Sequence, residues 1–367
     1  MPLQKGKWDI NLLLTVLALT CFGVLMVFSA SMYSASVEWN NEYFYFSKQI
    51  KAAIFGIFVM VIASYIPYRF YRRFAVLGII VSVILLVLVF VPSIGVEVNN
   101  ARRWINLRFM LFQPSELVKL AVILYMAHSL EQKKDKIRTF RDGILPYLVL
   151  AGVLGGLIYK EPNLSTALII FGIIFGMMFV AGVNLKYILA LGAVGVVGVV
   201  LLMQQASWRA GRIAAMFDPW AYRLDEGWQI IQSLMGLGAG GVFGQGLGNG
   251  KQKLLFMPEA ENDYILAHIG EELGLLGTLA VLFVFIYLIY RGVKIAINTP
   301  DRFGSLFAGG IMIMIGLQVM INVGVVTNSI PSTGIPLPFL SYGGTSLVMN
   351  LFAMGILLNI SRSANTG

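Results

Sequence analysis

Long apolar segments alternate with short polar ones along almost the whole of the 367-residue chain. An α-helix needs about 20 apolar residues to cross a hydrocarbon core of about 30 Å. The pattern predicts an all-α polytopic membrane protein with about ten spanning helices, and the whole chain, 1–367, forms a single integral membrane domain. We expect the spans at residues 10–33, 47–66, 74–92, 114–131, 144–160, 164–182, 186–203, 263–290, 303–327 and 343–361.

Composition supports this interpretation and excludes several classes of protein. Hydrophobic residues make up 58% of the chain and charged residues 12%, and the mean hydropathy is +0.79, unlike a soluble domain. The net charge of +9 does not indicate nucleic-acid binding, because the basic residues fall mainly between apolar segments. Cys21 is the single cysteine, so no internal disulfide can form. The first apolar segment is too long for a signal peptide and is expected to be retained.

Basic residues predict the orientation, because lysine and arginine gather in short cytoplasmic connections. With the N-terminus inside, both termini are cytoplasmic. Segments 93–113, 204–262 and 328–342 then lie outside, and 204–262 is a large outer loop between the seventh and eighth spans. The cytoplasmic side receives Lys5, Lys7, Arg69, Arg72, Arg73, Lys133, Lys134, Lys136, Arg138, Arg141, Lys186, Arg291, Lys294, Arg302 and Arg362.

Acidic residues concentrate where the outer loop meets the eighth span. Glu259, Glu261 and Asp263 lie within five residues of one another, followed by Glu271 and Glu272, in a chain with only 18 acidic residues. A carboxylate at a membrane surface can act as a general base or bind a metal ion. Asp also suits the N-cap of a helix, which is the structural alternative for Asp263.

Cationic side chains precede the fourth span and lie within it. Arg102 and Arg103 stand beside Trp104, so this group is either an interfacial anchor or a phosphate-binding site. Glu116 and Lys119 are three residues apart and share one helix face. They form either a structural ion pair or a pair that lines a substrate cavity.

The remaining polar segments exclude common cofactor sites. Residues 236–250 are rich in glycine, but Gln245 stands where a nucleotide-binding P-loop has its first glycine, so a compact or re-entrant loop is expected. His128 and His268 are the only histidines, and both fall in predicted spans, where they are expected to be helix-packing or interfacial residues. We therefore expect no nucleotide, haem or zinc. Three prolines in 331–338 predict a bent approach to the last span.

Several motifs, in this order and topology, resemble the SEDS family of bacterial shape, elongation, division and sporulation proteins, which includes RodA, FtsW and SpoVE. The resemblance covers nearly the whole chain. The residues at 232–233 and 246–253 resemble the FtsW and SpoVE branch more than RodA. The motifs are Arg103-Trp104-Ile105, Gln113 to Glu116 with Lys119, Gly227-Trp228-Gln229 to Gln232-Ser233, Gly240 to Gly248, Pro258-Glu259 to Asp263, Glu271 to Gly274, and Pro331 to Gly344.

The resemblance implies a peptidoglycan glycosyltransferase in the bacterial cytoplasmic membrane. Such an enzyme polymerises lipid II, the undecaprenyl-pyrophosphate-linked disaccharide-pentapeptide, into glycan strands on the outer face during cell division or sporulation. It also implies a partner, a class B penicillin-binding protein that crosslinks the strands, within a divisome, elongation or sporulation complex.

By the same resemblance, Asp263 matches the family's catalytic aspartate and is the expected general base. Cations must stabilise the pyrophosphate leaving group. Glu259 and Glu261 are candidates to hold a divalent cation, Mg²⁺ or Mn²⁺. The residues expected to contact the substrate are Arg102, Arg103, Glu116, Lys119, Arg212, Gln232, Ser233, Lys251, Lys253, Glu259 and Ser341.

Two positions depart from the family pattern. Glu261-Asn262 stands where many members have His-Thr before the aspartate, and Asn163 stands where many have an Asp. The first departure affects the surroundings of Asp263, and the second removes an acid from the connection between the fifth and sixth spans. Two other functions use similar features: a flippase that moves lipid II without making bonds, and a non-catalytic recruiter of a transpeptidase.

Overall fold

The computed structural model describes residues 6–98, 101–107, 111–204 and 207–364. A helix occupies each of the ten predicted ranges, and seven helical segments of the described chain are long and apolar enough to cross a membrane. The prediction of a mostly helical, multi-pass membrane protein is confirmed. The ten helices are α1 (Ile10–Trp39), α2 (Phe44–Tyr65), α4 (Ala75–Leu88), α5 (Pro114–Lys133), α7 (Leu145–Lys160), α8 (Leu164–Val180), α9 (Leu185–Gln204), α12 (Ile265–Asn298), α13 (Arg302–Val326) and α14 (Gly344–Ser361).

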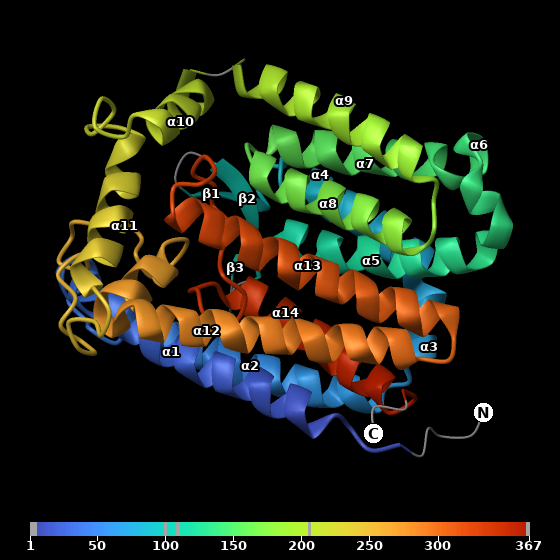
Figure 1. The fold of residues 1–367 in the computed structure, drawn as a ribbon, viewed down its shortest axis with the longest axis horizontal. Coiled ribbons are helices and arrows are strands. Elements are labelled where there is room, and N and C mark those ends of the chain that lie inside the picture. The colour runs from blue at the N-terminus through green and yellow to red at the C-terminus, as the bar shows by residue number, and fades with distance from the viewer. Residues whose placement is uncertain (1–5, 99–100, 108–110, 205–206, 365–367) are drawn as a thin grey trace.

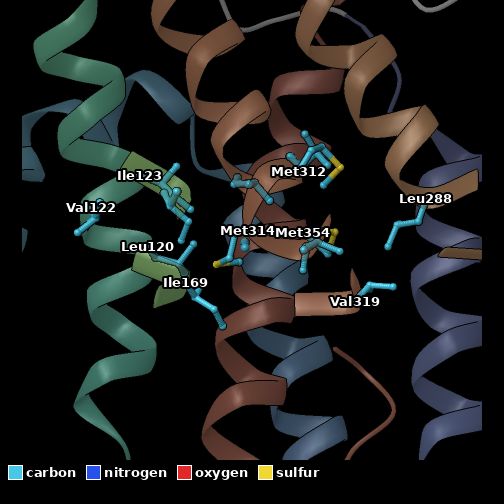
Figure 2. Packing of buried hydrophobic residues seen from close by; sticks show 14 of the residues in the cluster. Leu120, Val122, Ile123, Ile169, Leu288, Met312, Met314, Val319 and Met354 are labelled. Carbon is cyan, nitrogen blue, oxygen red and sulfur yellow. The ribbon is translucent and has the colours of Figure 1, made fainter. Parts of the chain in front are cut away.

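Helix α13 lies in the middle of the bundle, against α5, α8 and α12, while α2 packs along α14 (Figure 1). Buried aliphatic and methionine side chains from α5, α8, α12, α13 and α14 meet in one apolar region (Figure 2). Small residues let the helices approach closely: a Cβ added to Gly310 of α13 would lie 2.6 Å from Ile123 Cγ2 of α5. Close packing at small residues is how helices associate in membranes, where hydrophobicity does not drive contact.

The two described ends of the chain lie together at one end of the bundle. Arg362 Nε donates a hydrogen bond to the carbonyl of Gly6 at 3.2 Å. Asp9 forms an ion pair with Arg291 of α12 at 2.5 Å. All four residues lie in or beside segments expected to be cytoplasmic, so the contacts agree with an even number of membrane crossings.

Short elements complete the connections at the same end. They are α3 (Tyr68–Tyr71), η1 (Arg72–Phe74), η2 (Lys134–Arg138) and α6 (Phe140–Gly143). Arg72 Nε donates to His128 Nδ1 at 3.2 Å and pairs with Glu131 at 3.1 Å, so His128 has a polar partner beyond simple packing.

The strictly all-α prediction is wrong for the outer segment 93–113. This segment contains a three-stranded antiparallel sheet of β1 (Gly95–Val98), β2 (Ala101–Asn106) and β3 (Leu111–Phe112). Val96 lies opposite Trp104, and Ile105 lies opposite Phe112. Main-chain N–H and C=O groups that pack against the bundle need hydrogen-bond partners. In this segment, strand pairing supplies them.

The outer segment 204–262 is also more ordered than a loop. It contains α10 (Ser207–Phe217) and α11 (Gly227–Gly240), which lie at the end of the bundle opposite α6 (Figure 1). Helix α11 packs against α12. Helix α12 begins at Ile265, two residues after the predicted start, and it is interrupted at Gly274, where φ is 68° and ψ is −167°.

Candidate active site

Asp263 lies at the junction of the outer segment and α12, and the residue is half-buried. The N-cap of α12 is Tyr264, with no side-chain capping hydrogen bond, so Asp263 does not have the capping role that was its structural alternative. Its main-chain carbonyl accepts a hydrogen bond from Asn322 Nδ2 of α13 at 2.8 Å. The backbone is therefore fixed while the carboxylate stays available for chemistry.

The proline-rich segment 331–342 runs beside Asp263. A Cβ added to Gly334 would lie 3.3 Å from Asp263 Oδ2, so a larger residue there would crowd the carboxylate. Asn322 Nδ2 also donates to the carbonyl of Ile335 at 2.9 Å, and Tyr342 N donates to the carbonyl of Glu261 at 2.8 Å. The two hydrogen bonds donated by Asn322 and the main-chain bond of Tyr342 thus join the segment that contains Asp263 to the proline-rich segment.

Two arginines from different outer elements act on Asp263. Arg103, half-buried on β2, donates to the carbonyls of Glu161 at 3.0 Å and Pro162 at 2.5 Å. Arg212 of α10 pairs with Glu226 at 3.0 Å. Both positive charges lower the pKa of Asp263. The structure therefore brings together three residues that the sequence had assigned to one reaction.

The pKa of Asp263 is nevertheless raised to about 7, first because its carboxyl group is buried and then because Glu259 is nearby. The two arginines oppose this rise. A carboxyl group with a pKa near the working pH serves well as a general base, since it is partly ionised and still basic enough to take a proton.

Glu161 is a buried acid beside this site. It lies in the connection between α7 and α8, and neither carboxyl oxygen has a hydrogen-bond partner. Burial raises its pKa to about 8, against the opposing charge of Arg103. In the sequence, Lys160 stands beside Glu161 in this connection, and that adjacent base and acid were the available signal.

Glu259 and Glu261 do not form a metal site with Asp263. Glu259 is exposed and accepts a hydrogen bond from Asn262 Nδ2 at 3.1 Å. Glu261 is buried, and its pKa is raised to about 7, mainly by burial. Within the described ranges no group of three or more His, Cys, Asp or Glu side chains could hold a metal ion. The residues present therefore do not fit a protein-held cation.

The other cations near the sheet lie apart from Asp263. Arg102 is exposed and pairs with Glu97 across β1 and β2 at 3.1 Å, because alternate strand residues point to opposite faces. Glu116 and Lys119 form a buried ion pair at 2.8 Å within α5, as the structural reading of that spacing expected. Glu116 Oε2 has no hydrogen-bond partner.

The remaining predicted residues hold the outer elements in place. Ser233 Oγ of α11 donates to the carbonyl of Val326 at 2.9 Å, and Gln232 beside it is buried. Ser341 Oγ accepts from Leu337 N at 2.8 Å within the proline-rich segment. These contacts position main chain, and none of them involves Asp263.

Two predicted lysines lie in the glycine-rich part of the outer segment. Lys251 is exposed, and its main-chain N–H donates to Glu271 at 2.6 Å. Lys253 is buried in an ion pair with Glu272 at 2.9 Å. His268 also contacts Glu272, at 3.2 Å, so this buried helix residue has a polar partner in addition to its packing. The polar loop folds onto α12 and brings these groups together.

Asn322 bonds to the main chain of Asp263 and Gly334 lies beside its carboxylate, but neither was predicted as a site residue. An amide inside an apolar span is costly unless it has a polar partner, so Asn322 did carry a signal in the sequence. Its partner is 59 residues away, and only the tertiary structure identifies it. Gly334 gave no signal beyond its place in a proline-rich motif.

Comparison with known proteins gives the same result over the whole chain. Residues 10–366 match the family model of the FtsW, RodA and SpoVE proteins, described as "Cell cycle protein". The probable peptidoglycan glycosyltransferase FtsW of Geobacter metallireducens is 43% identical, with 97% of this chain and 95% of that protein covered. Stage V sporulation protein E of Bacillus subtilis is 41% identical, with 99% of each covered.

A solved structure described as "Structural coordination of polymerization and crosslinking by a peptidoglycan synthase complex" contains a chain with the same fold. The TM-score is 0.80 at 25% identity, and the match covers 98% of this chain and 99% of that one. The match to the family model extends through every outer segment that surrounds Asp263. The chain therefore belongs to the FtsW, RodA and SpoVE family of cell cycle proteins.

Proposed function

We propose that the chain is a peptidoglycan glycosyltransferase that polymerises lipid II, with Asp263 as its general base. One observation carries the assignment: the carboxyl group of the half-buried Asp263, with a pKa of about 7, lies within the electrostatic influence of Arg103 and Arg212. The similarity to proteins named as peptidoglycan glycosyltransferases supports the reaction class.

The chemistry needs a base and a place for negative charge. A hydroxyl group of the acceptor sugar attacks the anomeric carbon of the lipid-linked donor, and its proton passes to the Asp263 carboxylate. The new glycosidic bond forms as the bond to pyrophosphate breaks, and the lipid pyrophosphate leaves with the bonding electrons. Arg103 and Arg212 are the described cations placed to stabilise that charge.

We further propose that the ten helices all cross the membrane, with both termini cytoplasmic and Asp263 on the outer face. The ion pairs of the predicted cytoplasmic connections lie at one end of the bundle, and α10 and α11 lie at the other (Figure 1). Substrate attached to a lipid can then reach Asp263 from the outer leaflet. Lys251 and Lys253 are less suited to the pyrophosphate, since Lys253 is already paired with Glu272.

A crosslinking partner is the second part of the proposal. The structural relative acts in a peptidoglycan synthase complex that coordinates polymerization with crosslinking. No segment between helices is long enough to hold a transpeptidase domain, and the longest outer one, 204–262, is folded onto the bundle. A class B penicillin-binding protein would supply the missing reaction.

The test is polymerisation of labelled lipid II by the purified protein with such a partner. Wild type is expected to make long glycan strands and Asp263→Asn to make none. Asp225→Asn is the matched control, because Asp225 is an exposed acid of the same outer segment. Polymer from Asp263→Asn at the wild-type rate would overturn the general-base assignment. Transfer of lipid II across vesicles without polymer from wild type would favour a flippase.

A further inference from the structure

The interruption of α12 at Gly274 is filled by another part of the chain. In a continuous helix the carbonyls of Glu271 and Glu272 would accept hydrogen bonds from the N–H groups four residues later. Here they accept from Gln245 N and Gly246 N, both at 3.0 Å. The outer segment thus replaces the helix's own donors.

The same replacement occurs on the other side of the break. Leu275 N and Leu276 N, which lack their usual helical acceptors, donate to the carbonyls of Gly241 at 2.9 Å and Val242 at 3.2 Å. Four main-chain hydrogen bonds therefore join residues 241–246 to the two ends of the broken helix. The break has no unpaired main-chain groups at these four positions, which is why it can persist inside an apolar bundle.

Glycines allow the two backbones to meet. Gly274 has a positive φ, and a Cβ added there would lie 2.3 Å from Gly244 N. A Cβ on Gly244 would lie 2.2 Å from the carbonyl oxygen of Glu272. Side chains at either position would separate the inserted segment from the helix.

Two consecutive carboxylates then bind the segment that follows. Glu271 Oε1 accepts from the main-chain N–H groups of Lys251 at 2.6 Å and Gln252 at 3.2 Å. Glu272 Oε1 pairs with Lys253 Nζ at 2.9 Å. Both glutamates are buried, so these contacts are protected from competing water.

The Glu272 carboxylate also connects to α1. Ser29 Oγ donates to it at 2.8 Å, and His268 Nε2 lies 3.2 Å from Glu272 Oε1. All three side chains are buried. The end of the short helix 265–273 is therefore held by α1 and by the inserted segment.

We propose that Glu271 and Glu272 are positioning residues that hold residues 241–253 in the break of α12 and so set the place of Asp263. The helix 265–273 is about 13 Å long, with Asp263 just before one end and the two glutamates at the other. Because α12 is broken after this helix, the long membrane span alone does not determine where Asp263 lies. This inference rests on the proposed role of Asp263 in glycosyl transfer.

Glu271→Ala is the primary test, with Glu271→Gln as the conservative variant, since glutamine keeps an oxygen that can accept from Lys251 N and Gln252 N. Misplacing a catalytic group by about 1 Å can cost on the order of 100-fold in rate. We expect Glu271→Ala to lower kcat by that order with little change in KM, and Glu271→Gln to restore most of it. Glu42→Ala, an exposed acid between α1 and α2, is the control and should match wild type.

Hydrogen exchange provides the readout that does not depend on activity. In Glu271→Ala the amides of residues 245–252 should exchange faster, while those of α13 keep wild-type protection and so show that the protein is folded. Gly274→Ala introduces no charge change and should produce the same two effects by displacing Gly244.

The outcomes separate this inference from the proposed function. Faster exchange in Glu271→Ala with wild-type kcat would show that the inserted segment does not position Asp263. Wild-type exchange in both Glu271→Ala and Gly274→Ala would show that the glutamates do not hold it. Asp263→Asn should abolish polymerisation with exchange unchanged, and its failure to do so would instead overturn the role of Asp263.

Discussion

The side-chain amide of Asn322 donates one hydrogen bond to the main-chain carbonyl of Asp263 at 2.8 Å and another to that of Ile335 at 2.9 Å. Asn322 is buried near the end of α13, and it links the main chain of the proposed base to the proline-rich segment. Leaving a buried carbonyl without its donor costs roughly 1–3 kcal/mol. The main chain of the proposed catalytic residue is thus held by a side chain that does not bond to its carboxylate.

Asn322→Ala should therefore lower kcat for polymerisation on the order of 10-fold or more, because the Asp263 backbone loses its donor. The control is Asn350→Ala, in which a buried asparagine of α14 loses a bond within its own helix, to Ser346. Steady-state assays and thermal unfolding of both variants give the comparison. Equal kcat in the two variants at similar stability would contradict the link.

The pH dependence of polymerisation should show an acid limb near pH 7. Asp263 must be deprotonated to accept a proton, and its pKa is about 7, so kcat/KM rises with pH through that value. Glu259→Gln removes a charge that raises this pKa and should move the limb to lower pH. Arg103→Gln removes a charge that lowers it and should move the limb to higher pH.

Rates measured from pH 5 to 9 test these signs independently of the absolute activity of each variant. The shift for Glu259→Gln should be under about one pH unit, because the Glu259 side chain is exposed and solvent screens its charge. Shifts of both variants in one direction would show that Asp263 is not the group that titrates.

Arg103→Gln and Arg212→Gln should each reduce kcat by roughly 10²–10³-fold, the usual cost of removing one donor that stabilises developing charge. Arg102→Gln is a neighbouring control: its side chain is exposed and paired with Glu97 on the other face of β2. Surface ion pairs contribute little, so this variant should stay within about threefold of wild type. A loss as large as that of Arg103→Gln would indicate that both arginines bind pyrophosphate.

Glu161→Gln should remove a pH dependence of stability. The pKa of this carboxyl group is about 8 in the folded protein and ordinarily about 4.5, so between these values the unfolded chain releases a proton that the folded protein keeps. Stability therefore falls as pH rises through this window. Wild type should lose roughly 2 °C or more in Tm between pH 5 and pH 9 relative to Glu161→Gln, as measured by thermal unfolding in detergent. Parallel curves for the two proteins would contradict a buried protonated Glu161.

The periodicity of apolar residues was sufficient to predict the ten helical ranges, because a spanning helix must satisfy its main chain internally and cover itself with apolar side chains. The same rule applies less strictly outside the membrane. There the segments 93–113 and 204–262 fold into a sheet and two helices, since pairing with neighbouring elements decides their structure. The local pattern of apolar and polar residues does not predict that pairing.

Asp263, Arg103 and Arg212 were predicted as site residues by residue type and by resemblance to a family, and in the structure both arginines lie close enough to lower the pKa of Asp263. Arg102 was also predicted to contact the substrate. Successive residues of a strand point to opposite faces, and the Arg102 side chain pairs with Glu97 instead. Asn322 and Glu161 carried a signal in the sequence, but only the tertiary structure identifies their surroundings and those of Gly334.

The acidic residues after the outer loop show the same difference between what the sequence determines and what the tertiary structure decides. The sequence by itself determined that carboxylates would gather where a polar segment enters a membrane helix, because charge is confined there by the apolar composition around it. Only the tertiary structure separated Asp263, beside two arginines, from Glu271 and Glu272, which bind the inserted segment. The reason is physical: the ionisation and role of a carboxylate depend on its burial and on nearby charges and donors, and these come from parts of the chain far away in sequence.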